Sequence, residues 1–459
     1  MPWVPATFAQ RLPTDNLSIS SPESPSTLHV RPRKEKMETS GGDLMTTHLS
    51  RRRFLAQAAA ISLPLFVPSH VLAKPPRRKG AGDQVRLGVI GVGRRGQQLL
   101  EAMPGGAKVV AVCDVYRPRA EAVGGKYHAN VFTDFRQVIE KKNVDAVVIA
   151  TPDHWHAMPA ITACMAGKDV YCEKPLALTV SEGRMMVKAA RKHDRVFQVG
   201  TQQRSLRPHE VACRLIRDGK MGHVQRVVVA NNWSPTDERL PGEDVPEGMD
   251  WDKWLGQAPG DIPFNGKYIF PENEPGWSDR RFFCGGEMCG WGAHGYDQLQ
   301  WAMGYDESGP VAVEAEGSAG DAKVRWWYDC GTVVETGDAP KPGGKFYCEW
   351  GQLNIDRNKF NIMPEGLKRE LLRGVHDVAE SDEADHMRNF LACIRSRKRP
   401  NADVEIGQRS VTVAHLANIA RWVGGKLEWD AGAERFTNSG KANELLVRER
   451  RGGYELPEV

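Results

Sequence analysis

Three glycines are the first residues whose spacing suggests chemistry. Gly91, Gly93 and Gly96 stand between the apolar run 85–90 and the stretch 97–103. If the run is a strand and the stretch a helix, Gly91 permits a tight turn, Gly93 lets the backbone approach a pyrophosphate, and Gly96 lets helix and strand pack closely. The helix N-terminus adds amide donors and a dipole that favours phosphate. The spacing therefore predicts a dinucleotide-binding loop.

Asp114 follows a second apolar run, 108–113, about 20 residues beyond the glycines, where a carboxylate binds the adenosine ribose diol. This position favours NAD over NADP, although Arg117 close by leaves NADP open. Within the loop, Arg94 and Arg95 are further expected cofactor contacts.

Two polar segments follow further apolar runs, at the points where the predicted strands 144–150 and 169–172 end. Ligands of open parallel sheets bind beyond the carboxyl ends of the strands, so both segments should face the cofactor. His156 is expected nearest to the nicotinamide, although either it or His154 could instead cap the following helix. The full set of expected cofactor contacts here is Thr151, Pro152, His156, Glu173 and Lys174.

Lys174, within Glu173-Lys174-Pro175, is the candidate acid–base group. A lysine at the carboxyl end of a sheet strand, close to a cationic nicotinamide ring, should have its pKa lowered by burial and by like charge. It can then take a proton from an alcohol while a hydride leaves the carbon. The alternative is a Lys–Glu ion pair on the surface.

The glycine loop, the segment Thr-Pro-Asp-His-Trp-His and the tripeptide Glu-Lys-Pro together resemble the Gfo/Idh/MocA family, named after glucose–fructose oxidoreductase, inositol dehydrogenase and rhizopine catabolism. The resemblance extends over residues 84 to about 430. It implies that Lys174 reaches the substrate hydroxyl and the nicotinamide, and that the substrate is a small carbohydrate. It also implies a second domain with an open sheet, and homo-oligomers.

The segment 285–297 resembles the family's Asp-x-x-x-His element, whose side chains face the substrate from the start of a helix. His294 matches the histidine, but Gly290 stands where the aspartate would be. Without that carboxylate, His294 and Lys174 must orient the hydroxyl and relay its proton, or the chemistry differs. Asp297 lies one helical turn later and could orient His294 instead. A helix-cap or core role for His294 is the alternative.

Eight of the thirteen tryptophans fall between residues 233 and 327. Aromatic faces pack against the C–H faces of sugars, but most tryptophans fill cores or interfaces, where they bury large areas. We expect one or two to contact substrate, with Trp291 first because it lies within the histidine segment. Arg204 is a further candidate substrate contact.

The apolar patterns predict an α/β protein with two folded halves. Apolar runs that alternate with helical patterns predict an N-terminal Rossmann domain over residues 84–203. The more mixed pattern of residues 204–430 predicts an α+β substrate-binding domain with an open, largely antiparallel sheet. Its expected strands are 224–230, 311–317, 324–328 and 345–350, and its expected helices 383–397 and 407–423. Residues 431–459 are expected to form a C-terminal tail.

Residues 1–73 have the order of an export leader. Residues 1–45 are rich in Ser, Thr and Pro and are predicted to be disordered. Ser50-Arg51-Arg52-Arg53-Phe54-Leu55 then precedes a short apolar run, and the paired arginines resemble the twin-arginine (Tat) motif. We therefore expect recognition by the Tat export machinery and a periplasmic or otherwise exported location. A basic patch before a buried helix is the alternative.

The composition excludes several classes of protein. A chain of 459 residues that is 41% hydrophobic and 26% charged is typical of a globular protein of two or three domains. Without residues 1–73 its net charge is close to zero, and the absence of a long basic run argues against nucleic acid as a partner. The odd number of nine cysteines agrees with folding in a reducing cytoplasm before Tat export. No metal is expected, because Cys284, Cys289 and His294 have loose spacing and no second ligand pair follows.

Three functional hypotheses follow. The first is an NAD-dependent oxidoreductase acting on a sugar, sugar derivative or cyclitol, with a retained cofactor that is restored in each cycle by coupled oxidation and reduction of two sugars. The second is a redox-neutral glycoside hydrolase or lyase, in which transient oxidation of a ring hydroxyl permits elimination. The third, a cofactor-bound sugar sensor, is disfavoured by Lys174 beside an intact cofactor loop.

Overall fold

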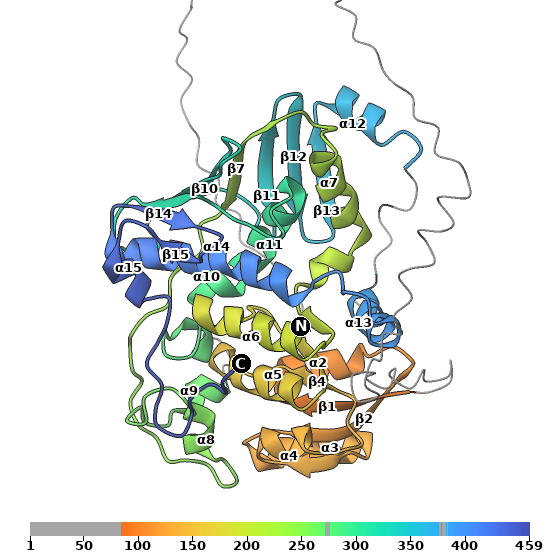
Figure 1. The fold of residues 1–459 in the computed structure, drawn as a ribbon, viewed down its shortest axis with the longest axis vertical. Coiled ribbons are helices and arrows are strands. Elements are labelled where there is room, and N and C mark those ends of the chain that lie inside the picture. Colours follow the sequence, from red (N-terminus) through yellow and green to blue (C-terminus); the bar gives the residue numbers. More distant parts are fainter. Residues whose placement is uncertain (1–83, 271–275, 376–377, 379–381, 383) are drawn as a thin grey trace, which may run out of the picture. The chain divides into compact units, whose positions relative to one another are not determined.

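The computed structural model describes residues 84–270, 276–375, 378, 382 and 384–459. The first half of this described part forms a six-stranded parallel sheet in the order β3-β2-β1-β4-β5-β6 (Figure 1). The order reverses between β1 and β4, where the carboxyl ends of the strands leave a crevice for a ligand. This is the predicted Rossmann arrangement. Its strands are β1 (Val85–Ile90), β2 (Ala107–Cys113), β3 (Asn130–Phe132), β4 (Ala146–Ile149), β5 (Asp169–Cys172) and β6 (Phe197–Val199).

Helices cover both faces of this sheet, which is why its strands are continuous apolar runs. On one face lie α4 (Phe135–Ile139), α5 (Ala157–Met165) and α6 (Val180–Lys192). On the other lie α2 (Arg94–Glu101), α3 (Arg117–Tyr127) and, from far along the chain, α13 (Ala384–Ser396).

Helix α13 belongs in space to the first half, although it follows the predicted boundary near residue 203. Its residues Met387, Phe390 and Leu391 are buried in the same apolar cluster as Leu87 and Val89 of β1. The two halves therefore share a core, because a helix of the second completes the packing of the first.

The second half of the described chain forms a nine-stranded sheet in the order β13-β12-β11-β7-β10-β9-β8-β14-β15. Strands β7 and β10 pair in parallel and the other neighbours pair antiparallel, so the predicted open, largely antiparallel sheet is confirmed. Buried apolar residues of helices α7 (Arg207–Arg217), α11 (Gly292–Met303) and α14 (Val404–Val423) share one core with this sheet. Its strands are β7 (Val224–Ala230), β8 (Ala312–Ala315), β9 (Val324–Trp327), β10 (Val333–Gly337), β11 (Gly344–Cys348), β12 (Gly351–Asp356), β13 (Lys359–Met363), β14 (Lys426–Asp430) and β15 (Arg435–Phe436).

The connection between β7 and α11 folds around an aromatic cluster, although its sequence shows few periodic segments. It contains α8 (Trp251–Leu255), α9 (Gly266–Ile269) and the short helix η3 (Gly276–Asp279). Trp254, Tyr268 and Phe283 are buried together, and the Phe283 ring packs edge-on against the other two at centroid distances of 4.7 Å and 5.4 Å. Tyr116, just after β2, packs against this cluster, so the connection is anchored beside the carboxyl end of the first sheet.

The segment 431–459, predicted to be a tail, is packed against the rest of the chain. It contains β15 and α15 (Gly440–Glu444). Arg448 Nε donates to Glu182 Oε1 at 2.7 Å, and Arg451 Nε donates to the carbonyl oxygen of Gly256 at 2.9 Å. These bonds tie the segment both to α6 and to the connection that contains α8.

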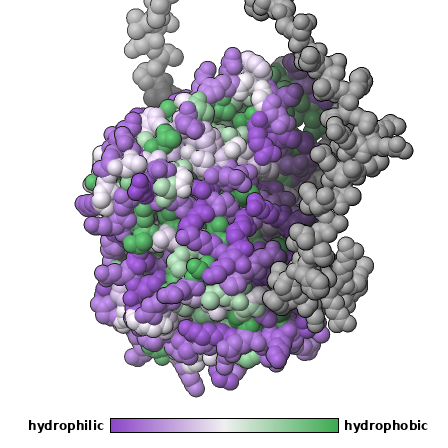
Figure 2. Space-filling model, in the orientation of Figure 1, coloured by the Kyte–Doolittle hydropathy of each residue, from purple (hydrophilic) through white to green (hydrophobic). Residues whose placement is uncertain are grey.

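Figure 2 shows hydrophilic side chains over most of the visible face, with apolar residues scattered among them. Across the described residues, no helix combines the length and the apolar composition needed to cross a membrane. The predicted leader lies outside these residues.

Candidate active site

A cavity of about 1540 Å³ opens beyond the carboxyl ends of β1, β2, β4 and β5. Its opposite wall comes from η3, α10 (Gly286–Gly290), the start of α11 and the turn between β12 and β13. Three large apolar side chains that the protein leaves exposed, Trp233, Phe270 and Trp291, line it. A pocket for one small ligand measures roughly 300–1,000 Å³, so this cavity has room for a dinucleotide beside a second small molecule.

The glycine loop fits a dinucleotide. Gly91 has a φ of +84°, and a Cβ there would lie 2.8 Å from the backbone of Ala150. A Cβ at Gly96 would lie 2.2 Å from the Gly91 carbonyl oxygen, so only glycine lets α2 pack this closely. At Gly93 the nearest atom to a Cβ would be Arg119 Nη1, 3.8 Å away. The chain itself therefore has room for a side chain at Gly93, and the space is free for a closely approaching pyrophosphate.

Asp114 lies at the rim of the cavity, directly after β2. Its carboxylate accepts hydrogen bonds from the backbone N–H groups of Val92 (3.1 Å) and Tyr116 (2.9 Å). Arg117 forms an exposed ion pair with Glu121 at 2.8 Å instead of lining the cavity. A fixed carboxylate here suits the ribose hydroxyls of NAD better than the extra phosphate of NADP.

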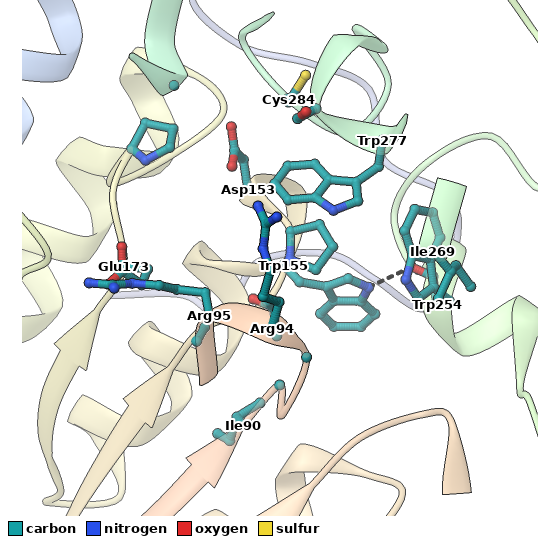
Figure 3. A pocket seen from close by; sticks show the side chains of 18 of the residues that line it. Ile90, Arg94, Arg95, Asp153, Trp155, Glu173, Trp254, Ile269, Trp277 and Cys284 are labelled. Atoms are coloured by element: carbon teal, nitrogen blue, oxygen red, sulfur yellow. Dashed lines mark hydrogen bonds and ion pairs between the residues drawn. The ribbon is translucent and has the colours of Figure 1, made fainter. Parts of the chain in front are cut away.

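Arg95 of α2 points toward Glu173 after β5 (Figure 3), and its Nε donates to Glu173 Oε1 at 2.8 Å. Glu173 is only 4% exposed and also accepts from the Tyr171 hydroxyl at 3.3 Å. These two expected cofactor contacts thus bind each other, and the pair joins the glycine loop to the strand that carries Lys174. Arg94 is exposed and lines the cavity.

Thr151 and Pro152 line the cavity, and the Thr151 hydroxyl oxygen is buried without a hydrogen-bond partner among the described residues. The expected contact of His156 with the nicotinamide is wrong. Its Nδ1 lies 2.8 Å from the carbonyl oxygen of Pro175 and its Nε2 3.0 Å from that of Thr151. The imidazole bridges the loops after β4 and β5, and it does not line the cavity.

Lys174 reaches from the end of β5 toward α10, and its Nζ donates to the carbonyl oxygen of Gly290 at 2.9 Å. Burial lowers the pKa of this lysine; Glu173 and Asp153 oppose the effect, while two nearby arginines add to it. A neutral amine that can accept a proton is therefore present at a lower pH than for a lysine in water.

His294 lies in the first turn of α11, is 4% exposed and lines the cavity. Its Nδ1 has no hydrogen-bond partner among the described residues. Burial lowers the pKa of His294 well below 6.5, and the nearby cations Lys174 and Arg357 add to the effect. The imidazole is therefore neutral near pH 7 and can hydrogen-bond a ligand. Trp291, with its ring centroid 6.4 Å from that of His294, also lines the cavity.

Asp153, in the short helix η1 (Asp153–Trp155), lines the cavity although it belongs to none of the expected contacts. Its side chain is almost completely buried, at 3% exposure. Burial raises the pKa of Asp153 to about 6, against the opposing effects of His156 and Lys174. The site therefore holds a titratable carboxyl group that acts electrostatically on the lysine.

Arg204 and Asp297, expected as substrate contacts, do not line the cavity. Arg204 pairs with Asp297 at 2.8 Å and with Asp306 at 2.7 Å. Asp297 also accepts from Ser410 Oγ at 2.7 Å, so this carboxylate does not orient His294. The expectation is wrong because buried charges need partners, and these two residues satisfy each other while tying the segment after β6 to α11 and α14.

Other cavity residues come from segments in which no sequence motif marks a binding site. Arg357 stands in the turn between β12 and β13, and Tyr454 stands in the segment predicted to be a tail. Neither follows a strand of the first sheet or belongs to a motif. The tryptophan content was a usable signal, because Trp233, Trp254 and Trp277 all line the cavity.

Eight of the nine cysteines are buried, and Cys330 is exposed. All nine lie within the described residues and none forms a disulfide. Cys284 and Cys289 are buried, and Cys289 Sγ lies 3.6 Å from His415 Nδ1. Within the part of the chain that the structure describes, no three His, Cys, Asp or Glu side chains are grouped so as to hold a metal ion.

Two family models match the chain. The model for the oxidoreductase family with an NAD-binding Rossmann fold matches residues 85–201, and the model for the C-terminal alpha/beta domain of the oxidoreductase family matches residues 227–456. The chain belongs to the Gfo/Idh/MocA oxidoreductase family. Its NAD-binding domain is the half that carries the glycine loop, Asp114 and Lys174.

Curated members of the family match over about a third of the chain. Inositol 2-dehydrogenase of Salmonella typhimurium is 33% identical over 144 residues, which are 30% of this chain and 43% of that enzyme. Inositol 2-dehydrogenase of Rhizobium meliloti is 35% identical over 150 residues, 32% of this chain and 45% of that enzyme. The match thus spans less than half the length of these curated relatives.

Solved structures align with a larger share of this chain than the curated relatives do. The WlbA dehydrogenase from Bordetella pertussis, solved in complex with NADH and UDP-GlcNAcA, is 20% identical with a TM-score of 0.56. The alignment covers 76% of this chain and 99% of that chain. This likeness shows that the two chains share a fold.

Replacing Gly93 with alanine tests the cofactor loop. We expect Gly93→Ala to weaken NADH binding by about tenfold, because the methyl group occupies space needed by the pyrophosphate. The melting temperature should not change, since the chain itself has room for a Cβ. Gly96→Ala should lower the melting temperature as well. Energy transfer from tryptophan to NADH measures binding, and circular dichroism measures unfolding. Unchanged NADH affinity in Gly93→Ala would contradict the assignment.

Replacing Asp153 with asparagine tests the electrostatics of the lysine. Above about pH 6 the Asp153 carboxylate is charged and raises the pKa of Lys174, so Asp153→Asn should lower that pKa. The amine of Lys174 should then become reactive toward an acylating reagent at lower pH than in the unaltered protein. Mass spectrometry of the peptide that contains Lys174 follows the reaction. Asp279→Asn is the matched control, because Asp279 also lines the cavity but pairs with Arg280 at 3.0 Å. An identical pH dependence in both variants would refute the coupling.

Proposed function

We propose that the protein is an NAD-dependent oxidoreductase that transfers a hydride between a hydroxyl group of a sugar, sugar derivative or cyclitol and the cofactor. One observation carries the proposal: Lys174, with its lowered pKa, and the neutral His294 line the same cavity as the glycine loop. The relatives named inositol 2-dehydrogenase support a polyhydroxylated ring as substrate.

Lys174, His294 and Trp291 have different roles in the proposed reaction. In the direction of oxidation, the neutral amine of Lys174 takes the proton of the substrate hydroxyl. His294 holds the same hydroxyl through its unpartnered nitrogen, and Trp291 presents an aromatic face to the C–H face of the ring. When bound, NAD supplies the carbon that accepts the hydride. In the reverse direction the protonated lysine returns the proton to the carbonyl oxygen.

We further propose that the cofactor stays bound through the cycle and is restored by paired oxidation and reduction of two sugars. The connection between β7 and α11 supports this proposal, because Lys253, Ile269 and Phe270 extend the cavity wall over the Rossmann half. Tyr454 adds a wall from the C-terminal segment. A ligand that contacts segments from three parts of the chain should leave slowly.

A second candidate function is a redox-neutral glycoside hydrolase or lyase acting through a transient keto-sugar. Gly290 favours it, because the carboxylate that the family places at this position for hydroxyl oxidation is missing. Transient oxidation of a ring hydroxyl would acidify the neighbouring C–H and permit elimination of the glycosidic substituent, after which the oxidation is reversed. This cycle leaves no net change in the cofactor.

Absorbance of the purified protein separates the two candidates. We expect bound NAD(H) after purification, and a change in the NADH absorbance band when a single sugar or cyclitol is added. Release of an aglycone from aryl glycosides without a net absorbance change would instead establish the redox-neutral reaction. Absence of bound or bindable nicotinamide would contradict both.

Lys174→Met should reduce either activity by at least about a hundredfold, because general acid–base catalysis contributes roughly that much or more. Lys168→Met is the matched control, since Lys168 binds the carbonyl oxygens of Lys141 and Val144 and does not line the cavity. Turnover and NADH binding are measured on both. Full activity of Lys174→Met would refute the role assigned to the lysine.

We also propose export through the Tat pathway to the periplasm or beyond. The support is the sequence of residues 50–73, together with cysteines that form no disulfide among the described residues. We expect the double change Arg51→Lys with Arg52→Lys to keep the protein in the cytoplasm with its leader uncleaved, while Arg53→Lys is exported normally. Cell fractionation and immunoblotting measure both. Normal export of the double variant would contradict the pathway.

A further inference from the structure

Gly290 leaves an open space beside the reactive lysine. It is the last residue of α10, and a Cβ built there would meet no atom within 4 Å. Its carbonyl oxygen accepts the hydrogen bond from Lys174 Nζ. Neither crowding nor backbone conformation therefore requires a glycine at this position. The space next to the lysine amine is available to a ligand.

The charges around this space are mainly positive. Lys174 is one, and Arg357 reaches in from the turn between β12 and β13, with its guanidinium carbon 5.8 Å from the centre of the Trp291 ring. Among the described residues, the guanidinium of Arg357 takes part in no hydrogen bond or ion pair. It acts electrostatically on both Lys174 and His294, so all three side chains share one electrostatic environment.

The carboxylates of the same cavity do not neutralise Arg357. Glu173 binds Arg95, and Glu287 binds Lys341 at 3.1 Å from the opposite wall. Asp153 is buried and acts electrostatically on Lys174, and it forms no ion pair with Arg357. The cavity thus presents an unpaired arginine and an unfilled space on its substrate side.

We propose that this space receives an anionic group of the substrate, a carboxylate of a sugar acid, and that Arg357 is its binding partner. The inference rests on the proposed function, because it assigns the substrate class of the same site. Planar guanidinium groups bind carboxylates and phosphates through paired charge-assisted hydrogen bonds. A substrate carboxylate would occupy the volume left free at Gly290, while Trp291 and His294 hold the ring.

Two substitutions test the proposal, and each has a matched control. Arg357→Gln removes the cation, and Arg369→Gln is its matched control, since Arg369 is an exposed residue of α12 (Glu365–Leu371) that does not line the cavity. Gly290→Asp places a negative charge in the open space, and Gly290→Asn fills the same volume without charge. Neither side chain should disturb folding, because a Cβ at this position meets nothing.

The probes are matched pairs of methyl pyranosides of glucose, galactose and mannose with their uronic acids, together with the corresponding sugar 6-phosphates. Quenching of tryptophan fluorescence measures binding, and NADH absorbance measures turnover. We expect the unaltered protein and Arg369→Gln to bind at least one uronic acid about tenfold or more tightly than its neutral partner. Arg357→Gln and Gly290→Asp should remove this preference, while Gly290→Asn should retain part of it.

Each remaining outcome has a defined meaning. The 6-phosphates could bind more tightly than the uronic acids, with the same dependence on Arg357. That result would overturn the carboxylate and identify a phosphate as the anionic group. Equal binding of charged and neutral sugars would overturn this inference and leave the proposed function standing. Binding of none of the probes would overturn this inference. It would overturn the proposed function as well only if the protein also binds no NADH.

Discussion

One buried carboxylate, Glu173, joins the two chemical halves of the site. It accepts hydrogen bonds from Arg95 on the helix that follows the glycine loop, from the Tyr171 hydroxyl and from the backbone N–H of Lys174. Glu173 is buried while Arg95 is partly exposed, so loss of the arginine would leave a buried carboxylate without the cation that pairs with it. Glu173 therefore couples the helix that follows the cofactor loop to the strand end that carries the lysine.

The first half was predictable because of how its sheet is covered. With helices on both faces, each strand keeps only apolar residues, so Val85–Ile90 is recognisable as a strand without knowledge of its neighbours. The glycine loop and Lys174 follow such strands directly. His156 shows the limit of this reasoning: its position after β4 was right, but only the structure shows that both ring nitrogens are engaged by carbonyl oxygens.

The second half was less predictable, because its contacts join distant parts of the chain. Arg204 and Asp297 are 93 positions apart, and a charged residue looks the same in sequence whether it faces a ligand or a buried partner. Arg357 enters the cavity only because β12 and β13 pair, and Tyr454 only because Arg448 and Arg451 fix the segment before it.

Helix α13 has a consequence for the order in which the molecule can be made. The ribosome completes the six strands of the first sheet almost two hundred residues before it reaches Phe390, which fills the core of that sheet. During this interval, the nascent nucleotide-binding half exposes an apolar face. Tyr454 emerges later still, so the wall of the cavity is finished only near the end of synthesis. A cofactor that binds before synthesis ends would therefore meet a cavity that still lacks this part of its wall.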